Sequence, residues 1–279
     1  MEPGADTASQ ITDPLPRGLA SKLALLEEEL RRLGNVIVAF SGGADSAFLA
    51  AVAQRALGRE AVTAVTAVSP SLAKDEEADC EALTREWGMR WTPIATSEME
   101  RIAYQINDTD RCFHCKAELM SVLAPVALAE EAVIVLGVNT DDLGDRRPGQ
   151  RAATDGGAEF PLVAAGFTKD DVREVSRHLG LRTWNKPAAA CLASRIPYGT
   201  EVSVAILGRV ERAEAALRRL GFEQVRVRHY GETARVEVEL DRLSEILALR
   251  GEVIRAVHAS GYRYVTLDLE GFRSGNLNG

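Results

Sequence analysis

The chain has 279 residues, 46% of them hydrophobic, and a formal net charge of −8 at pH 7. This length suits one large α/β domain and a small second one. The negative charge disfavours a large nucleic-acid-binding surface, and we expect no nucleic-acid partner. No apolar run approaches the roughly 20 residues that span a membrane, so we also expect no membrane contact.

The first residues lack the basic flank and the apolar stretch of a secretory signal. We therefore predict a flexible leader over 1–18 and a cytoplasmic protein. In a cytoplasmic chain the four cysteines are more typical of free thiols, metal ligands or redox groups than of disulfides.

Residues 19–199 show the pattern of an α/β domain with a doubly wound parallel sheet. An amphipathic helix is expected over 21–33, with leucines on one face and glutamates on the other. Runs rich in Val and Ala that do not alternate with polar residues indicate strands covered on both faces. The predicted strands are 35–40, 61–68, 90–94 and 133–137, and the predicted helices are 47–57, 75–87, 116–129 and 168–179.

The pattern changes near Thr200. Before that point, 138–160 is a long, polar, glycine-rich stretch, typical of a functional or mobile loop, and 181–199 shows no periodicity. Residues 200–270 are interpreted as a small α+β domain for substrate binding or oligomerisation. Its expected helices are 203–220 and 243–259, and its expected strands are 224–229, 233–240 and 262–267. We predict a flexible tail over 271–279.

A Ser-Gly-Gly-Ala-Asp-Ser sequence follows the first predicted strand and leads into an alanine-rich helix. Its polar and glycine positions are Ser41, Gly42, Gly43, Asp45 and Ser46. Glycines permit backbone conformations in which successive N–H groups point into one concavity, and a helix N-terminus adds partial positive charge. The loop therefore predicts a pyrophosphate site for ATP. It is not a Walker loop, because no Gly-Lys-Ser/Thr follows. The alternative is a tight strand-to-helix turn without a ligand.

A loop rich in Asp and Gly follows the fourth predicted strand. Because strand ends of a parallel sheet converge, we expect Gly137 and Asp141 to face the phosphate loop and to share in ATP binding. Asp45 is the predicted Mg²⁺ ligand, with Asp141 or Asp145 as further candidates, since Mg²⁺ prefers carboxylates together with phosphate oxygens. Arg147 is predicted to bind a phosphate or a substrate carboxylate. A solvated loop without a ligand is the alternative.

Cys112 and Cys115 have the C-x-x-C spacing of a metal site or a redox pair. A zinc site would need four ligands, and a second C-x-x-C is missing from the sequence. Together with Cys191, the two thiols suit an iron–sulfur cluster in which one iron lacks a protein ligand. The alternative is a pair of partly buried thiols at the start of a helix.

Cys191 lies in the irregular segment, four residues before Arg195. A nearby guanidinium favours the thiolate, which is the reactive form of cysteine. A thiolate beside an adenylate-forming site can act as a nucleophile or as a cluster ligand. We predict Cys191, Asp45 and Arg195 as catalytic residues; the alternative for Cys191 is an inert small side chain.

Arg226 and Arg228 alternate with valines on a predicted strand and therefore share one face. Glu237 can lie opposite them on the paired strand, and Glu214 lies on the preceding helix. Two arginines on one face indicate a site for a phosphate or a carboxylate. The alternative is a solvated face whose salt bridges contribute little.

Four motifs occur together and in order: the phosphate loop, the Asp- and Gly-rich loop, the C-x-x-C segment 110–116 and the Cys-Leu-Ala-Ser-Arg-Ile-Pro-Tyr-Gly segment 191–199. In this combination, over about 19–269, the chain resembles the LarE family of PP-loop ATP pyrophosphatases. These ATP-dependent sulfur transferases make the nickel-pincer nucleotide cofactor of lactate racemase. The resemblance implies that a carboxylate of a pyridinium-3,5-biscarboxylate mononucleotide attacks ATP, and that sulfur then displaces AMP from the acyl adenylate.

The resemblance also implies a homo-oligomer, and places Arg226, Arg228, Glu214 and Glu237 near substrate or metal. Two sulfur sources occur in the family. Either the cysteine corresponding to Cys191 gives up its own sulfur, or three cysteines bind a [4Fe-4S] cluster that carries an extra sulfide. The additional C-x-x-C pair favours the cluster type, so the implied cofactors are ATP, Mg²⁺ and the [4Fe-4S] cluster.

Three other functions fit parts of the pattern. A PP-loop tRNA thiolase would share adenylation and three cysteines, but the acidic chain lacks an additional basic RNA-binding domain. A synthetase that uses ammonia would not need the cysteines. A nucleotide-binding sensor would bind ATP without releasing pyrophosphate.

Overall fold

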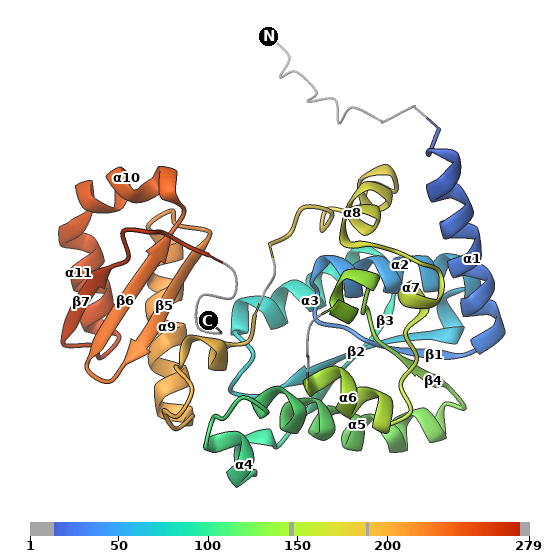
Figure 1. Cartoon of the computed structure of the whole chain (residues 1–279), viewed down its shortest axis with the longest axis horizontal. Coiled ribbons are helices and arrows are strands. Elements are labelled where there is room, and N and C mark those ends of the chain that lie inside the picture. Colours follow the sequence, from blue (N-terminus) through green and yellow to red (C-terminus); the bar gives the residue numbers. More distant parts are fainter. Residues whose placement is uncertain (1–13, 145–147, 188–189, 274–279) are drawn as a thin grey trace.

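The computed structural model describes residues 14–144, 148–187 and 190–273. Within these ranges the chain forms two sheets, each with its own helices (Figure 1). The larger sheet is parallel and has the strand order β3-β2-β1-β4. Its strands are β1 (Val36–Ala39), β2 (Val62–Val68), β3 (Arg90–Ala95) and β4 (Val133–Val135). The predicted α/β fold with a parallel sheet is confirmed.

Helices cover both faces of this sheet. The core on one face includes residues of α1 (Arg17–Leu33), α2 (Ala44–Leu57), α3 (Lys74–Glu86) and α8 (Lys169–His178). The core on the other face includes residues of α5 (Arg111–Ala129) and α6 (Pro148–Asp155). Val36 and Val38 belong to the first core and Ile37 to the second, because successive side chains of a strand point to opposite faces. This double burial explains why β1 shows no polar alternation.

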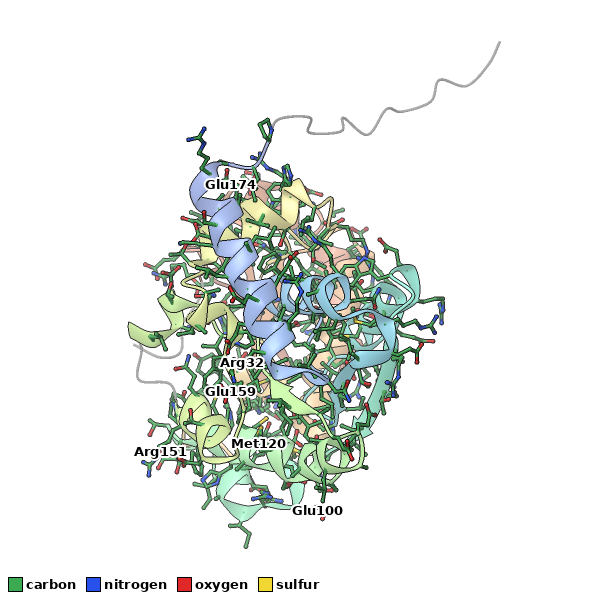
Figure 2. All side chains as sticks on the ribbon, turned by 90° about the vertical axis from the view of Figure 1, so that its right-hand side faces the viewer. Arg32, Glu100, Met120, Arg151, Glu159 and Glu174 are labelled. Atoms are coloured by element: carbon green, nitrogen blue, oxygen red, sulfur yellow. The ribbon has the colours of Figure 1, made fainter. Side chains whose placement is uncertain are left out.

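In the described ranges, α5 is the one helix that is long and apolar enough to span a membrane by length and composition. This differs from the expectation that no apolar run approaches such a length. Leu119, Met120 and Leu123 of α5 belong to the core on the sheet's second face. A Cβ on Gly156, next to α6, would lie only 2.8 Å from the side chain of Met120, which Figure 2 labels. These contacts pack one face of α5 against the sheet and α6.

The second sheet has the order β5-β6-β7. Its strands are β5 (Val225–Tyr230), β6 (Thr233–Val238) and β7 (Tyr264–Leu267). The first pair is antiparallel and the second is parallel. Residues of α9 (Val204–Arg219), α10 (Leu243–Ala248) and α11 (Arg250–Ala259) complete the apolar core of this unit. We call this part the small unit; Figure 1 shows it, coloured orange to red, beside the large unit that contains the parallel sheet. The domain boundaries at 19–199 and 200–270 stay a prediction.

α1 begins at Arg17, inside the predicted leader 1–18 and four residues before the predicted helix start at 21. Two further helices also begin several residues earlier than the sequence pattern predicts. α2 begins at Ala44 and not at 47, so Asp45 and Ser46 lie in its first turn. α5 begins at Arg111 and not at 116, so the C-x-x-C pair lies in the first turns of a helix. Both extensions add polar residues to the start of the helix, where a hydrophobic periodicity gives no signal.

The regions expected to be irregular contain short helices. The stretch 138–160 includes a 3₁₀ turn, η3 (Thr140–Gly144), followed by α6, and 181–199 includes η4 (Leu192–Arg195). The further short helices are η1 (Arg59–Ala61), η2 (Glu98–Glu100), α4 (Ile102–Gln105), α7 (Pro161–Ala164) and η5 (Leu240–Arg242).

The single helix predicted over 243–259 is in fact divided into α10 and α11. Leu249 leaves helical geometry between them, with φ −90° and ψ 15°. Gly251, a poor helix former, lies two residues further on, in the first turn of α11. The hydrophobic pattern continues across the break because both helices face the same small core.

Candidate active site

The predicted phosphate loop joins β1 to α2 through a tight turn. Gly42 has a φ of +67°, a left-handed conformation that favours glycine. Ser46 Oγ donates to the carbonyl of Gly43 at 3.1 Å and accepts the N–H of Ser41 at 3.2 Å. These bonds close the loop around the start of α2, whose first N–H groups have no acceptor within the helix. Such a terminus is suited to bind a phosphate.

Gly137 lies directly against the start of α2. A Cβ at this position would come within 2.8 Å of the carbonyl carbon of Asp45 and of the backbone nitrogen of Ser46. The contact arises because β4 is the neighbour of β1, so the loops after both strands meet at the carboxyl edge of the sheet. The expected convergence of the two loops is therefore observed, whereas the role of Gly137 in ATP binding stays a prediction.

The carboxylate of Asp45 joins three segments of the chain. Its Oδ1 accepts the side-chain amide of Asn139 at 3.2 Å, and its Oδ2 forms a short ion pair with the ammonium group of Lys169. Asp141 is engaged with the start of α8, where its Oδ2 accepts the N–H of Lys169 at 2.8 Å. Arg147, for which we predicted an anion-binding role, lies outside the described residues, as does Asp145.

Asn139 and Lys169 were not among the predicted site residues. Asn139 stands within the Asp- and Gly-rich loop and is 2% exposed, so a search for amides beside the predicted carboxylates would have found it. Lys169 follows the Thr168 N-cap of α8. A lysine in the first turn of a helix is unremarkable in sequence, and only the fold brings it to Asp45.

The three predicted cluster cysteines lie in one region, in which Cys115 and Cys191 are near the buried side chain of Tyr104. The Tyr104 phenol interacts electrostatically with the thiols of Cys115 and Cys191, and the Cys115 thiol interacts with those of Cys112 and Cys191. Burial, and secondly the neighbouring Cys191, raise the pKa of Cys115 to about 12. Cys112 and Cys191 are exposed, and all four cysteines of the chain are free.

Across the described ranges, no three His, Cys, Asp or Glu side chains are close enough together to hold a metal ion. The three thiols are therefore neighbours that do not form a preassembled metal site. Their chemistry nevertheless fits a cluster, because thiolates are the usual ligands of iron–sulfur centres. A bound cation would also offset the burial that keeps Cys115 protonated. The cluster stays a proposal.

Residues 191–199, here called the Cys191 segment, are held in place by two hydrogen bonds to their backbone. The N–H of Leu192 donates to the carbonyl of Ser71, beyond β2, at 2.9 Å. Arg111, the first residue of α5, donates through Nη1 to the carbonyl of Ala193 at 2.9 Å. These bonds fix Cys191 next to the helix that carries the C-x-x-C pair.

Arg195 joins the Cys191 segment to the small unit. It donates to the carbonyl of Cys191 at 2.9 Å, and its Nε and Nη2 donate to the two carboxylate oxygens of Glu214 at 2.9 and 3.1 Å. Glu214 is fully buried and also accepts the N–H of Val227 at 3.0 Å. Burial opposes ionisation of Glu214, but the Arg195 charge and these hydrogen bonds outweigh it and lower the pKa of the carboxyl group.

The predicted strand pairing around the two arginines is correct, since Arg226 lies opposite Glu237 in the register of β5 and β6. A solvated face, the alternative we considered, is wrong: the exposed fractions of Arg226, Arg228 and Glu237 are 8%, 6% and 0%. Arg228 donates to Glu237 Oε2 through Nε and Nη2 at 3.0 and 2.9 Å, and to the carbonyl of Ser194 through Nη1 at 2.9 Å. This face of β5 therefore packs on the Cys191 segment.

Burial lowers the pKa of Arg226 to about 10, and the like charge of Arg195 adds to the effect. Its guanidinium group also lies over the ring of Phe272, 5.1 Å from the centroid. The site thus holds several guanidinium groups close to the Cys191 segment, where an anionic ligand would be stabilised.

The chain is similar in sequence to one family profile and to three known proteins. A sequence profile of NAD synthase matches residues 20–130. An uncharacterised protein of Synechocystis is 44% identical over 93% of this chain and 98% of its own length. The pyridinium-3,5-bisthiocarboxylic acid mononucleotide synthase of Lactiplantibacillus plantarum is 40% identical over 93% of this chain and 95% of its own length. An uncharacterised protein of Methanocaldococcus jannaschii is 31% identical over 60% of this chain. With this similarity and its phosphate loop, the chain belongs to the LarE family of ATP-dependent sulfur transferases.

Proposed function

We propose that the protein inserts sulfur into pyridinium-3,5-biscarboxylic acid mononucleotide and so makes the thiocarboxylate precursor of the nickel-pincer cofactor of lactate racemase. The observation that carries this proposal is the 40% identity to a synthase named for the bisthiocarboxylic acid, over 95% of that enzyme. The phosphate loop and the three neighbouring cysteines support it, because the reaction needs both an ATP site and a sulfur site.

In the first step, a carboxylate oxygen of the substrate attacks the α-phosphorus of ATP. An O–P bond forms, the bond between the α- and β-phosphates breaks, and pyrophosphate leaves with the electron pair. The N–H groups of the phosphate loop stabilise the charge that develops on the leaving group. Asp45, a carboxylate in the first turn of α2, would hold Mg²⁺, which neutralises phosphate charge when it is bound.

In the second step, sulfur attacks the acyl carbon, a C–S bond forms and the C–O bond to AMP breaks. Cys112, Cys115 and Cys191 would hold a [4Fe-4S] cluster, which supplies the sulfide for this step when it is bound. Arg195 positions Cys191 by donating to its carbonyl. The reaction on both carboxylates consumes two ATP and two sulfides.

The buried arginines of the small unit would bind the substrate's phosphate or carboxylates. An anion beside Arg226 would offset the burial and the like charge that lower its pKa. Glu214 and Glu237 hold Arg195 and Arg228 in place through ion pairs. We assign substrate binding to the small unit for this reason, and we expect a cytoplasmic homo-oligomer as in the family.

The decisive experiment measures iron and acid-labile sulfide in protein that is purified and reconstituted without oxygen, beside its Cys112→Ser variant. We expect near-stoichiometric iron and sulfide in the parent and their loss in the variant. The same parent protein should convert the biscarboxylate mononucleotide and ATP to thiocarboxylate, AMP and pyrophosphate.

Two results would redirect the proposal. Absence of iron in both proteins, together with a Cys191 that is lighter by one H₂S after turnover, would replace the cluster by Cys191 as a single-use sulfur donor. Pyrophosphate release with tRNA, but not with the mononucleotide, would favour a tRNA thiolase.

A further inference from the structure

The turn between α4 and α5 is built around a buried asparagine. Asn107 is 0% exposed and has a φ of +62°. This left-handed conformation is uncommon outside glycine, and asparagine is among the residues that adopt it most readily. A buried side-chain amide must also find acceptors for its two N–H groups and a donor for its oxygen. The partners of Asn107 therefore show what this turn holds in place.

The amide nitrogen of Asn107 binds the backbone at the end of the Cys191 segment. Nδ2 donates to the carbonyls of Pro197 and Thr200, each at 2.8 Å, and to that of Ile196 at 3.3 Å. In return, the N–H of Gly199 donates to the backbone carbonyl of Asn107 at 3.0 Å. One side chain thus fixes the course of a stretch that lies 90 residues further along the chain.

The amide oxygen of Asn107 accepts a hydrogen bond from Arg111, the residue that begins α5. The same Nη1 of Arg111 donates to the carbonyl of Ala193 at 2.9 Å. Ala193 lies two residues after Cys191 and belongs to an apolar cluster against which Cys115 packs. Asn107 and Arg111 together therefore hold the Cys191 segment against the first turns of α5, which carry the C-x-x-C pair.

We propose that Asn107 is a positioning residue of the sulfur site, which sets the separation between the Cys191 thiol and the C-x-x-C pair. Its amide nitrogen is the essential group, because three backbone carbonyls converge on it. Without that donor the carbonyls lose a partner, and the segment relaxes away from α5 to find water. The inference rests on the proposed function in so far as the sulfur step uses the three thiols together.

Bridging of thiols in the full-length, iron-free protein measures this separation. Dibromobimane joins two neighbouring thiols, and peptide mass spectrometry identifies the joined pair. A bridge from Cys191 to α5 reports the positioning, whereas a bridge within the C-x-x-C pair lies on one helix and serves as the internal reference. Asn107→Asp keeps the shape of the side chain but turns an oxygen toward the carbonyls. We expect the ratio of the two bridges to fall about tenfold in this variant, which corresponds to about one net hydrogen bond.

A second variant separates the amide from the backbone conformation. Glycine adopts the left-handed conformation without strain and introduces no buried charge, so Asn107→Gly removes only the side-chain contacts. The bridge ratio should fall in this variant as well. Asn35→Asp is the matched control, because the Asn35 amide also donates to a distant backbone carbonyl, that of Glu130, but on an exposed surface. Each assay is run below the melting temperature of the variant, so that a loss of stability alone changes neither bridge.

The outcomes separate this assignment from the proposed function. A bridge ratio within about twofold of the parent in either Asn107 variant, less than the effect of one hydrogen bond, would overturn the assignment and leave the proposed function intact. A parent that bridges the C-x-x-C pair but never joins Cys191 to α5 would overturn both the assignment and the site of three thiols. A parent that forms both bridges but does not convert the mononucleotide would contradict the proposed function alone.

Discussion

Arg195 and Glu214 form a bidentate ion pair that is almost completely buried, with exposed side-chain fractions of 4% and 0%. The pair links the segment that carries Cys191 to the helix that packs on β5. Arg218 also donates to Glu214, at 3.0 Å. The position of Cys191 and the packing of the small unit therefore depend on the same carboxylate.

Replacement of Glu214 by Gln should lower the free energy of unfolding by about 3–5 kcal/mol, because it leaves the buried Arg195 charge without its counter-charge. Urea denaturation of parent and variant measures the difference. Glu81→Gln is the matched control, since Glu81 pairs with Arg85 on an exposed surface and should contribute less than about 1 kcal/mol. Equal effects of the two substitutions would contradict the importance of the buried pair.

The same carboxylate should make the fold sensitive to acid. Because the pKa of folded Glu214 lies below its ordinary value of 4.5, the ionised group stabilises the fold above that pH. This contribution is lost as the pH falls through the folded pKa. The free energy of unfolding of Glu214→Gln should consequently decrease less than that of the parent between about pH 5 and pH 3. Parallel curves for the two proteins would show that other carboxyl groups dominate the acid response.

Gly137→Ala should disturb the phosphate loop without touching a charged residue. The added methyl group would lie 2.8 Å from the backbone of Asp45 and Ser46, and such overpacking costs about 1–3 kcal/mol. We expect a lower melting temperature and weaker ATP binding in a titration. Gly18→Ala in α1 is the control: no atom lies within 4 Å of its Cβ position, and helix propensity predicts a gain of about 0.5–1 kcal/mol.

The fold of the large unit could be predicted because the residue pattern of its strands and the usual topology of parallel sheets indicate the same structure. The non-alternating strands, the phosphate loop after β1 and the convergence of the β1 and β4 loops follow from rules that hold for parallel sheets. The pairing of Arg226 with Glu237 likewise follows from the period of two along neighbouring strands.

The side-chain partners within the site could not be predicted in the same way. Lys169 is 124 residues from Asp45 in the chain, and Asn107 is 90 residues from Pro197. Partners that lie so far apart in the chain leave no local sequence pattern from which their contact could be predicted. The burial of Arg226 and Arg228 depends on the packing of β5 against the Cys191 segment, which the alternation along one strand does not reveal.

The cysteines should differ in their reactivity toward iodoacetamide. Cys112 and Cys191 are exposed, whereas Cys80 is fully buried, and burial raises the pKa of Cys80 to about 11 and of Cys115 to about 12. Since the thiolate is the reacting species, the exposed pair should be alkylated first in iron-free protein. Peptide mass spectrometry over a time course measures the order.

Reconstitution with iron and sulfide turns this order into a test of the cluster. If Cys112, Cys115 and Cys191 are its ligands, the two exposed cysteines should become protected in the reconstituted protein, and a chelator should restore their alkylation. The Cys112→Ser variant should leave Cys191 reactive after the same treatment, because a cluster lacking one of its three thiolates is held weakly. Unchanged alkylation of Cys191 in reconstituted parent protein would instead point to Cys191 as a free thiol, available to donate its own sulfur.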